Sequence, residues 1–277
     1  MLKAFYAVVI LIAGCYAAVA QGSGNPPQRG SIVNPDIVKD LAPSGTLHAA
    51  INLGNAVLAQ KDGATGELRG VSTDLARELA RRLGLAVELV AFEAAGKVFE
   101  ALKANAWDVA FLAIEPVRAA EIDFTAPYVL IEGTYMVPSD SPPKTIADVD
   151  RAGVRIAVGR ASAYDLFLTR TIKHATLVRA QTGGGRAMID LFLADKLEVA
   201  AGVRQPLVEY AKTNPGVRVM DGRFMEIQQA MGTPKGRASG ADYLRAFVED
   251  MKASGFVADA LKRSNQPDAV VAPLAAK

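Results

Sequence analysis

Apolar residues recur every four positions between Thr73 and Gly84. Leu75, Leu79 and Leu83 fall on one side of a helical wheel, and charged residues take the opposite side. This spacing predicts an amphipathic helix whose apolar face packs on a core. We expect Thr73 to cap the start of the helix and Gly84 to end it.

Strand-like and helix-like segments alternate along most of the chain. The apolar, strand-like runs include TLHAAINLG, LAVELVAF, WDVAFLAI and GVRIAVG, and helical segments such as GKVFEALKANA lie between them. Strand–helix–strand units of this length favour parallel strands covered by helices. The pattern restarts after Pro138, which predicts two α/β lobes in sequence. A later amphipathic helix carries Tyr243, Phe247 and Met251 four residues apart, and the pattern alone does not assign it to a lobe.

The N-terminus has the features of an export signal. Lys3 supplies a positive charge, and residues 4–14 (AFYAVVILIAG) are almost wholly apolar. A run of this length followed by small residues is typical of a secretory signal peptide and is short for a membrane-spanning helix. A buried core helix is the alternative for residues 4–14.

Two processing routes fit this signal. Cleavage after Ala20 satisfies the small-x-small rule of signal peptidase, whereas the segment that ends at Cys15 resembles a lipobox, in which the cysteine carries a lipid. We expect a signal peptide over residues 1–20 and a linker over residues 21–44. Cys15 is the only cysteine, so either route leaves a mature domain without a disulfide or a cysteine metal site.

Composition narrows the classes of function. The chain has 277 residues, of which 51% are hydrophobic and 22% charged, as in globular proteins. Its net charge of +2 predicts no broad basic face, so nucleic acid is not an expected partner. His48 and His174 are far apart and lack companion ligands, and no motif of a hydrolase or a phosphate-binding loop occurs. We therefore expect no cofactor and no metal.

Several segments resemble one family in order and spacing. These are GTLHAAIN, RGVSTDLARELARRLGLAVELV, ALKANAWDVAFLAI, RAAEIDFTAPY, DVDRAGVRIAVG and YLRAFVEDMKASG. They are similar to the bacterial extracellular solute-binding proteins of the amino-acid-binding family, the receptors of ATP-driven (ABC) importers. The run IDFTAPY after Arg118 is the most specific of them.

The resemblance implies a two-lobed periplasmic-binding-protein fold of type II, an α/β fold with mixed sheets, flanking helices and a two-strand hinge. Lobe 1 would comprise residues 45–133 and 230–265, lobe 2 would comprise residues 134–229, and a tail would follow over residues 266–277. A periplasmic monomer of this kind binds a small carboxylate, an amino acid or related organic acid, in its cleft. It then delivers the ligand to an inner-membrane permease.

The resemblance also implies a role for Arg118, which stands where the family places the arginine that holds a ligand carboxylate. A guanidinium binds a carboxylate through two parallel hydrogen bonds. The alternative is a surface arginine paired with Glu121.

A second part of the site is expected in the turn that contains Gly159, Ala161 and Ser162. Ser162 is placed to cap the next helix, with Asp165 as a partner in the manner of a capping box. A helix N-terminus offers free N–H groups that suit an anion, and the family uses this turn for the carboxylate. A cap without a ligand role is the alternative. Asn52 and Asn55, after the first strand, are further candidates, with a turn role as their alternative.

The resemblance also implies an aspartate that binds the α-amino group of the ligand, and this aspartate is missing here. By its distance from Glu198, Val203 takes that place, and Arg204 follows it. The serine and threonine usual before the arginine are Ala113 and Glu115 here. Either Glu115 supplies the lost negative charge, or the ligand has no α-amino group and Arg204 faces a second acidic group.

Two alternative functions share this scaffold. Some relatives are dehydratases of cyclohexadienyl acids, in which case Glu115 would act as a general acid. A sensor lobe that signals to a membrane partner is the other alternative.

Overall fold

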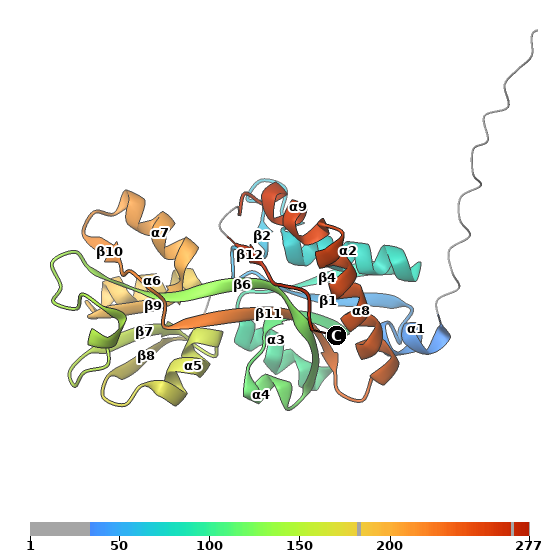
Figure 1. Ribbon diagram of the computed structural model, residues 1–277, viewed down its shortest axis with the longest axis horizontal. Coiled ribbons are helices and arrows are strands. Elements are labelled where there is room, and N and C mark those ends of the chain that lie inside the picture. Colours follow the sequence, from blue (N-terminus) through green and yellow to red (C-terminus); the bar gives the residue numbers. More distant parts are fainter. Residues whose placement is uncertain (1–33, 182–183, 267–268, 277) are drawn as a thin grey trace, which may run out of the picture. The chain divides into compact units, whose positions relative to one another are not determined.

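The computed structural model describes residues 34–181, 184–266 and 269–276, all of which belong to one compact unit (Figure 1). The expected signal peptide, its cleavage site and Cys15 lie outside the described residues. Across the described ranges, no helix is both long enough and apolar enough to cross a membrane.

The strands form one large mixed sheet and a small hairpin. In the large sheet the main order is β4-β1-β5-β11-β6-β9-β7-β8, and β10 and β12 also pair with β6. Its strands are β1 (Thr46–Asn52), β4 (Ala86–Phe92), β5 (Val109–Ala113), β6 (Ile122–Pro138), β7 (Arg155–Gly159), β8 (Thr176–Ala180), β9 (Val199–Val203), β10 (Val217–Val219), β11 (Met225–Pro234) and β12 (Val270–Val271). The hairpin consists of β2 (Gln60–Lys61) and β3 (Leu68–Arg69).

Helices cover both parts of this sheet. They are α1 (Pro35–Leu41), α2 (Val71–Leu83), α3 (Ala95–Ala101), α4 (Pro116–Ala119), α5 (Ala163–Thr171), α6 (Gly185–Ala194), α7 (Arg204–Thr213), α8 (Ala238–Ala253) and α9 (Phe256–Arg263), with short 3-10 turns η1 (Leu102–Ala104) and η2 (Ile146–Asp148).

Two parallel groups of strands are joined by two long antiparallel strands. β1 pairs in parallel with β4 and β5, and β7 pairs in parallel with β8 and β9, as the sequence predicts. We call the first group and its helices lobe 1 and the second group and its helices lobe 2. β6 pairs with β11 and then with β9, while β11 also pairs with β5, so these two strands run through both lobes (Figure 1). The expected two-strand hinge corresponds to β6 and β11, whereas the residue boundaries of the lobes stay a prediction.

The helix α2 follows the predicted pattern, with its start shifted. Leu75, Leu79 and Leu83 are buried, and Gly84 ends the helix in the left-handed conformation at φ 69°. Thr73 is not the cap, because the helix begins two residues earlier, after Gly70. The Thr73 hydroxyl instead donates to the Gly70 carbonyl, 2.7 Å away. Gly70, at φ 125°, makes the tight turn that leads into the helix. The general preference of threonine for cap positions does not reveal such a turn.

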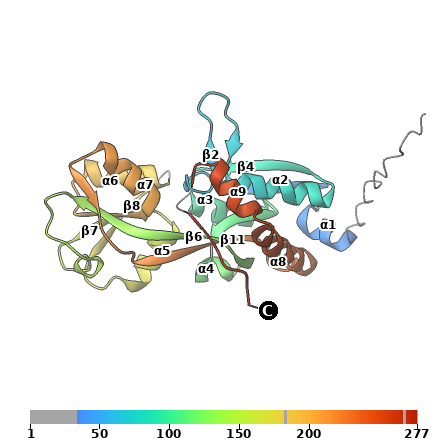
Figure 2. The same cartoon turned by 45° about the horizontal axis from the view of Figure 1, so that its top comes forward.

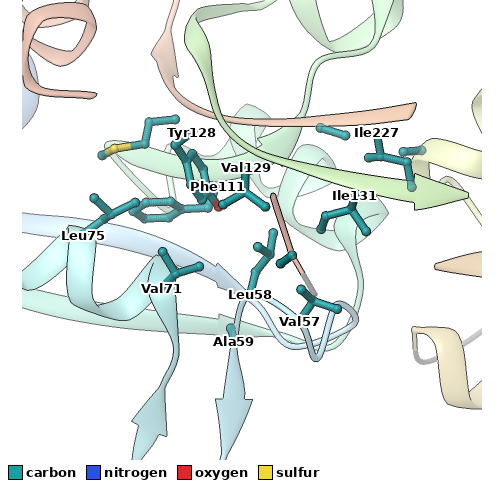
Figure 3. Packing of buried hydrophobic residues seen from close by; sticks show 14 of the residues in the cluster. Val57, Leu58, Ala59, Val71, Leu75, Phe111, Tyr128, Val129, Ile131 and Ile227 are labelled. Atoms are coloured by element: carbon teal, nitrogen blue, oxygen red, sulfur yellow. The ribbon is translucent and has the colours of Figure 1, made fainter. Parts of the chain in front are cut away.

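The core of lobe 1 joins α2 to the long strands. Figure 3 shows side chains from α2, β5, β6 and β11 gathered in one cluster. The rings of Phe111 and Tyr128 meet edge to face, with centroids 6.1 Å apart. Fully burying a large apolar side chain contributes about 1.5–3 kcal/mol, so this cluster holds the start of β6 against lobe 1.

Both chain ends contain secondary structure outside the expected lobes. Part of the expected linker is the helix α1, whose Leu41 is fully buried. Asp40 accepts a hydrogen bond from the Gly240 amide, which ties α1 to the start of α8 (Figure 2). The expected tail contains β12, which pairs with β6. Both segments are short and depend on partners about 140 to 200 residues away, which local patterns cannot reveal.

Candidate functional site

A small cavity lies where strands of both lobes end. Asn52 ends β1, Ala113 ends β5, Gly159 ends β7 and Val203 ends β9, and all of them line the cavity. In open α/β sheets, ligands bind at the carboxyl ends of strands. The cavity measures about 40 Å³, and roughly 10–15 Å³ on the same measure is enough to hold one water molecule.

Most of the predicted site residues meet at this cavity. Its lining includes the following predicted residues: Asn52, Asn55, Ala113, Arg118, Gly159 and Ser162. Glu115, Ala161 and Arg204 are not part of the lining, although each is held by contacts described below.

Arg118 is the buried cation of this site. It lies in α4, which starts after β5 with Glu115 as N-cap and Pro116 as the first residue. The side chain is 1% exposed, so it is not the surface arginine of the alternative interpretation. Nη1 donates to the Ala113 carbonyl at 3.1 Å, and Nη2 donates to the Ala161 carbonyl of lobe 2 at 2.9 Å.

The charge of Arg118 has no anionic partner in contact. Within the described residues, no carboxylate oxygen lies within 4.0 Å of its guanidinium nitrogens. Burial lowers the pKa of Arg118 to about 10, against the attraction of the nearby Glu115 carboxylate. The side chain is therefore still a cation at neutral pH, held in the cavity wall by neutral carbonyls.

The turn before α5 has the predicted cap. Ser162 is the N-cap, and its hydroxyl accepts from the Asp165 amide at 3.0 Å. The Asp165 carboxylate accepts from the Ala161 amide at 2.8 Å, one residue before the position that a capping box would use. This bond holds Ala161 in the left-handed conformation, at φ 55°, which few non-glycine residues adopt. The strained turn presents the Ala161 carbonyl to Arg118.

Sequence reasoning missed Tyr164 and Gln229, which also line the cavity. Burial raises the pKa of the Tyr164 hydroxyl to about 12, against the opposing influence of Ser162 and Gly159. A Cβ on Gly159 would lie 2.8 Å from this hydroxyl, so a larger residue there would displace the tyrosine. Tyr164 could have been identified from the sequence, because it comes two residues after the capping Ser162. Gln229 comes from β11, where it pairs with Ala113, and its local sequence carries no such signal.

Glycines let the two lobes touch beside the cavity. A Cβ on Gly184 would lie 2.2 Å from the Gly54 Cα, and the Gly185 amide donates to the Gly54 carbonyl at 3.3 Å. A Cβ on Gly96 would lie 2.8 Å from the Ala161 Cβ. The triple glycine before α6 is thus part of a close backbone contact, at least through its described residues Gly184 and Gly185.

Glu115 contacts lobe 2 instead of the cavity. Its Oε2 lies 2.7 Å from Nη2 of Arg170 in α5. This oxygen accepts no hydrogen bond from a described residue, so the contact is an ion pair without good hydrogen-bond direction. The negative charge of this carboxylate is thereby balanced by an arginine on the other lobe.

Arg204 belongs to the hinge. Its Nε donates to Oε2 of Glu132 in β6 at 2.6 Å, and its Nη1 donates to the Met220 carbonyl at 3.4 Å. These bonds keep the side chain outside the cavity lining, whereas the preceding Val203 is within it.

The two histidines are not part of the cavity lining. His48 Nδ1 lies 3.0 Å from Asp108 Oδ2, and the His174 amide donates to Asp150. Among the described residues, no group of His, Cys, Asp and Glu side chains is placed to hold a metal ion.

Comparison with known families identifies the chain. The model of the bacterial extracellular solute-binding proteins, family 3, matches residues 56–265. The chain belongs to this family. The geometry of this solute-binding protein agrees with that assignment, since its cavity lies between two lobes joined by two long strands.

Solved structures share its fold at low sequence identity. An arginine-binding protein mutant from T. maritima is 19% identical with a TM-score of 0.70, and the match covers 83% of this chain and 99% of that one. The L-cysteine receptor of Neisseria gonorrhoeae is 22% identical with a TM-score of 0.70, over 81% and 92% of the two chains.

An ancestral amino acid-binding protein, described as a precursor of cyclohexadienyl dehydratase, is 20% identical with a TM-score of 0.68, over 82% and 98%. No curated protein matches the sequence. These structures establish the two-lobed fold of this solute-binding protein.

Proposed function

We propose that this solute-binding protein captures a small carboxylate between its lobes, with Arg118 as the main anchor. The supporting observation is the buried guanidinium that has no carboxylate in contact. A buried charge without a partner is costly, and an anionic ligand in the adjoining cavity removes that cost. The Arg118 side chain uses two of its five N–H donors on the Ala113 and Ala161 carbonyls, so donors remain for a ligand.

The turn of lobe 2 supports the same proposal. Ser162 and the first residues of α5 line the cavity, and a helix N-terminus carries unpaired N–H groups and a partial positive charge. A carboxylate held by Arg118 from lobe 1 and by this turn from lobe 2 would bridge the lobes. Ligand binding then favours the closed arrangement, because only that arrangement supplies both sets of contacts.

Family membership supports the proposed delivery of the ligand to an ABC permease from the periplasm. The export signal expected over residues 1–20 fits this location, with a lipid anchor at Cys15 as the alternative. A monomer is sufficient, because both halves of the site come from one chain. A co-expressed permease and ATPase that bind the loaded protein would distinguish import from signalling to a sensor partner.

The dehydratase alternative has less support. One structural neighbour is a precursor of such an enzyme, but Glu115, the residue considered as a general acid, is paired with Arg170 and is not part of the cavity lining. We therefore propose binding without turnover.

The test is calorimetric titration of the protein that lacks residues 1–20 with small carboxylates, prephenate included. The expected result is saturable binding that leaves each ligand chemically unchanged. Arg118→Ala is expected to weaken the tightest ligand by about 2–5 kcal/mol, and Arg118→Lys by less, since a lysine keeps the charge but not the fork. Arg151→Ala, on the surface of lobe 2, is the control. Unchanged affinity in Arg118→Ala would rule out the anchor, and product formation would favour the enzyme.

A further inference from the structure

We infer that the carboxylate bound here carries no ammonium group, and that the cleft selects small 2-oxo or 2-hydroxy acids over α-amino acids. This inference rests on the proposed function and adds the chemical class of its ligand. Four observations carry it: the charges of the lining, the pairing of nearby carboxylates, the apolar side chain at position 203 and the direction of the hydrogen bonds.

The charged side chains of the cavity lining all have the same sign. Arg118 and Arg160 belong to it, whereas no aspartate or glutamate does among the described residues. An ammonium group entering this cavity would lose its hydration beside two cations without meeting an anion. A second cation on the ligand is therefore disfavoured, while a carboxylate is favoured.

Two carboxylates close to this lining, Glu115 and Asp165, already have partners. Glu115 pairs with Arg170 at 2.7 Å. The Asp165 carboxylate accepts a hydrogen bond from the Ala161 amide at 2.8 Å and forms an ion pair with Arg179 at 2.9 Å. Redirecting either carboxylate to a ligand ammonium would break its existing pair with an arginine, so neither is a ready counter-ion.

Position 203 has an apolar side chain. Val203 ends β9, lines the cavity and provides no side-chain hydrogen bond at the start of α7. Ile227 from β11 is also part of the lining. A valine accepts no hydrogen bond, so a ligand ammonium next to it would remain unsatisfied.

Two asparagines of the lining are oriented by hydrogen bonds to the backbone. The side-chain oxygen of Asn52 accepts from the Gly54 amide at 3.0 Å, and that of Asn55 accepts from the Val57 amide at 3.3 Å. These bonds orient the amide groups, because a flip would set NH₂ against N–H. Their NH₂ groups, which donate no hydrogen bond to a described residue, are the groups left for a ligand. Together with the remaining Arg118 donors, they suit a ligand rich in acceptor oxygens.

The experiment compares matched ligands by calorimetry on the protein that lacks residues 1–20. The sets are L-alanine with L-lactate and pyruvate, L-leucine with its 2-hydroxy and 2-oxo analogues, and L-glutamate with 2-hydroxyglutarate and 2-oxoglutarate. In the set that binds tightest, we expect the oxo or hydroxy acid to bind at least about tenfold tighter than the amino acid, a difference of about 1.4 kcal/mol. An amino acid that binds equally well or better overturns the inference.

Two further outcomes separate this inference from the proposed function. If no carboxylate binds, or if Arg118→Ala leaves binding unchanged, the proposed function fails. If Arg118→Ala weakens binding but the amino acid is the preferred ligand, the proposed function stands and only the inferred ligand class is wrong.

A substitution locates the selectivity. Val203→Asp places a carboxylate in the lining. It should raise the affinity for the amino acid, relative to the affinity for its oxo analogue, by at least about tenfold. Val203→Asn, of similar shape and without charge, is the matched control and should change the ratio much less. If the ratio of the affinities for the amino acid and its oxo analogue is the same in both variants, the assignment of selectivity to position 203 is overturned. Thermal unfolding of both variants checks that they are folded.

Discussion

Glu115 at the start of α4 and Arg170 in α5 form an ion pair between the lobes, with Oε2 and Nη2 2.7 Å apart. The two side chains differ in exposure: 4% for Glu115 and 43% for Arg170. The pair lies near Arg118, which makes a second contact between the lobes through the Ala161 carbonyl. Two arginines, one from each lobe, therefore hold the cleft together.

We predict that Arg170→Ala weakens ligand binding more than Glu115→Gln does. Removing Arg170 leaves a buried carboxylate unpaired when the lobes meet, whereas Glu115→Gln leaves an arginine that water can solvate. Because Arg170 is partly exposed, the expected loss for Arg170→Ala is about 1–2 kcal/mol of binding free energy. Calorimetry on both variants and on the double variant measures it. Losses that simply add in the double variant would mean that the pair does not couple the lobes.

We predict that Gly184→Ala reduces ligand affinity at least about tenfold while the fold stays intact. The added Cβ would lie 2.2 Å from the Gly54 Cα, so the lobes cannot approach as closely. Gly185→Ala is the matched control, since a Cβ there has no neighbour within 4 Å. Small-angle scattering should show a more open ligand-bound form in Gly184→Ala alone, and equal affinities in the two variants would contradict the prediction.

We predict that Arg204→Ala affects stability and leaves ligand selectivity unchanged. Arg204 joins Glu132 of the hinge strand β6 to the Met220 carbonyl, away from the cavity. Hydrogen bonds to charged groups contribute about 1.5–3 kcal/mol, and the partial exposure of this pair reduces the expected loss to about 1–2 kcal/mol. Denaturant unfolding measures the loss. A changed ranking of the ligand sets in this variant would show that Arg204 does contact ligand.

We predict a small acid-sensitive contribution from Glu78 in α2. Hydrogen bonds from Arg81, together with those from Arg82, lower its pKa to about 2 from its ordinary value of 4.5. A carboxylate with a lowered pKa stabilises the fold above about pH 4.5, and this contribution is lost as the pH falls towards 2. Since Arg81 is exposed, the contribution is expected to be below about 1 kcal/mol. The difference in unfolding free energy between the wild type and Glu78→Gln should shrink over this pH range, and a constant difference would contradict the prediction.

Local patterns were enough for the features that depend on near neighbours in the chain. The four-residue spacing of Leu75, Leu79 and Leu83 determines which face of α2 is buried, whatever it packs on. Ser162 and Asp165 determine a cap within one turn of helix. The run after Arg118 pointed to the family and so to the two-lobed fold, which the family match supports.

The tertiary structure decided which groups meet across the chain. Arg118 and Ala161 are 43 residues apart, and Gln229 reaches the cavity only because β11 pairs with β5. Glu115 was a candidate for the site by sequence, yet its pairing with Arg170 removes it from the cavity lining. Helical periodicity and the Ser162 cap arise from contacts within a few residues, so the sequence by itself determines them. The charge balance of a cleft arises from side chains that only folding brings together, and it is decided by the packing of the two lobes.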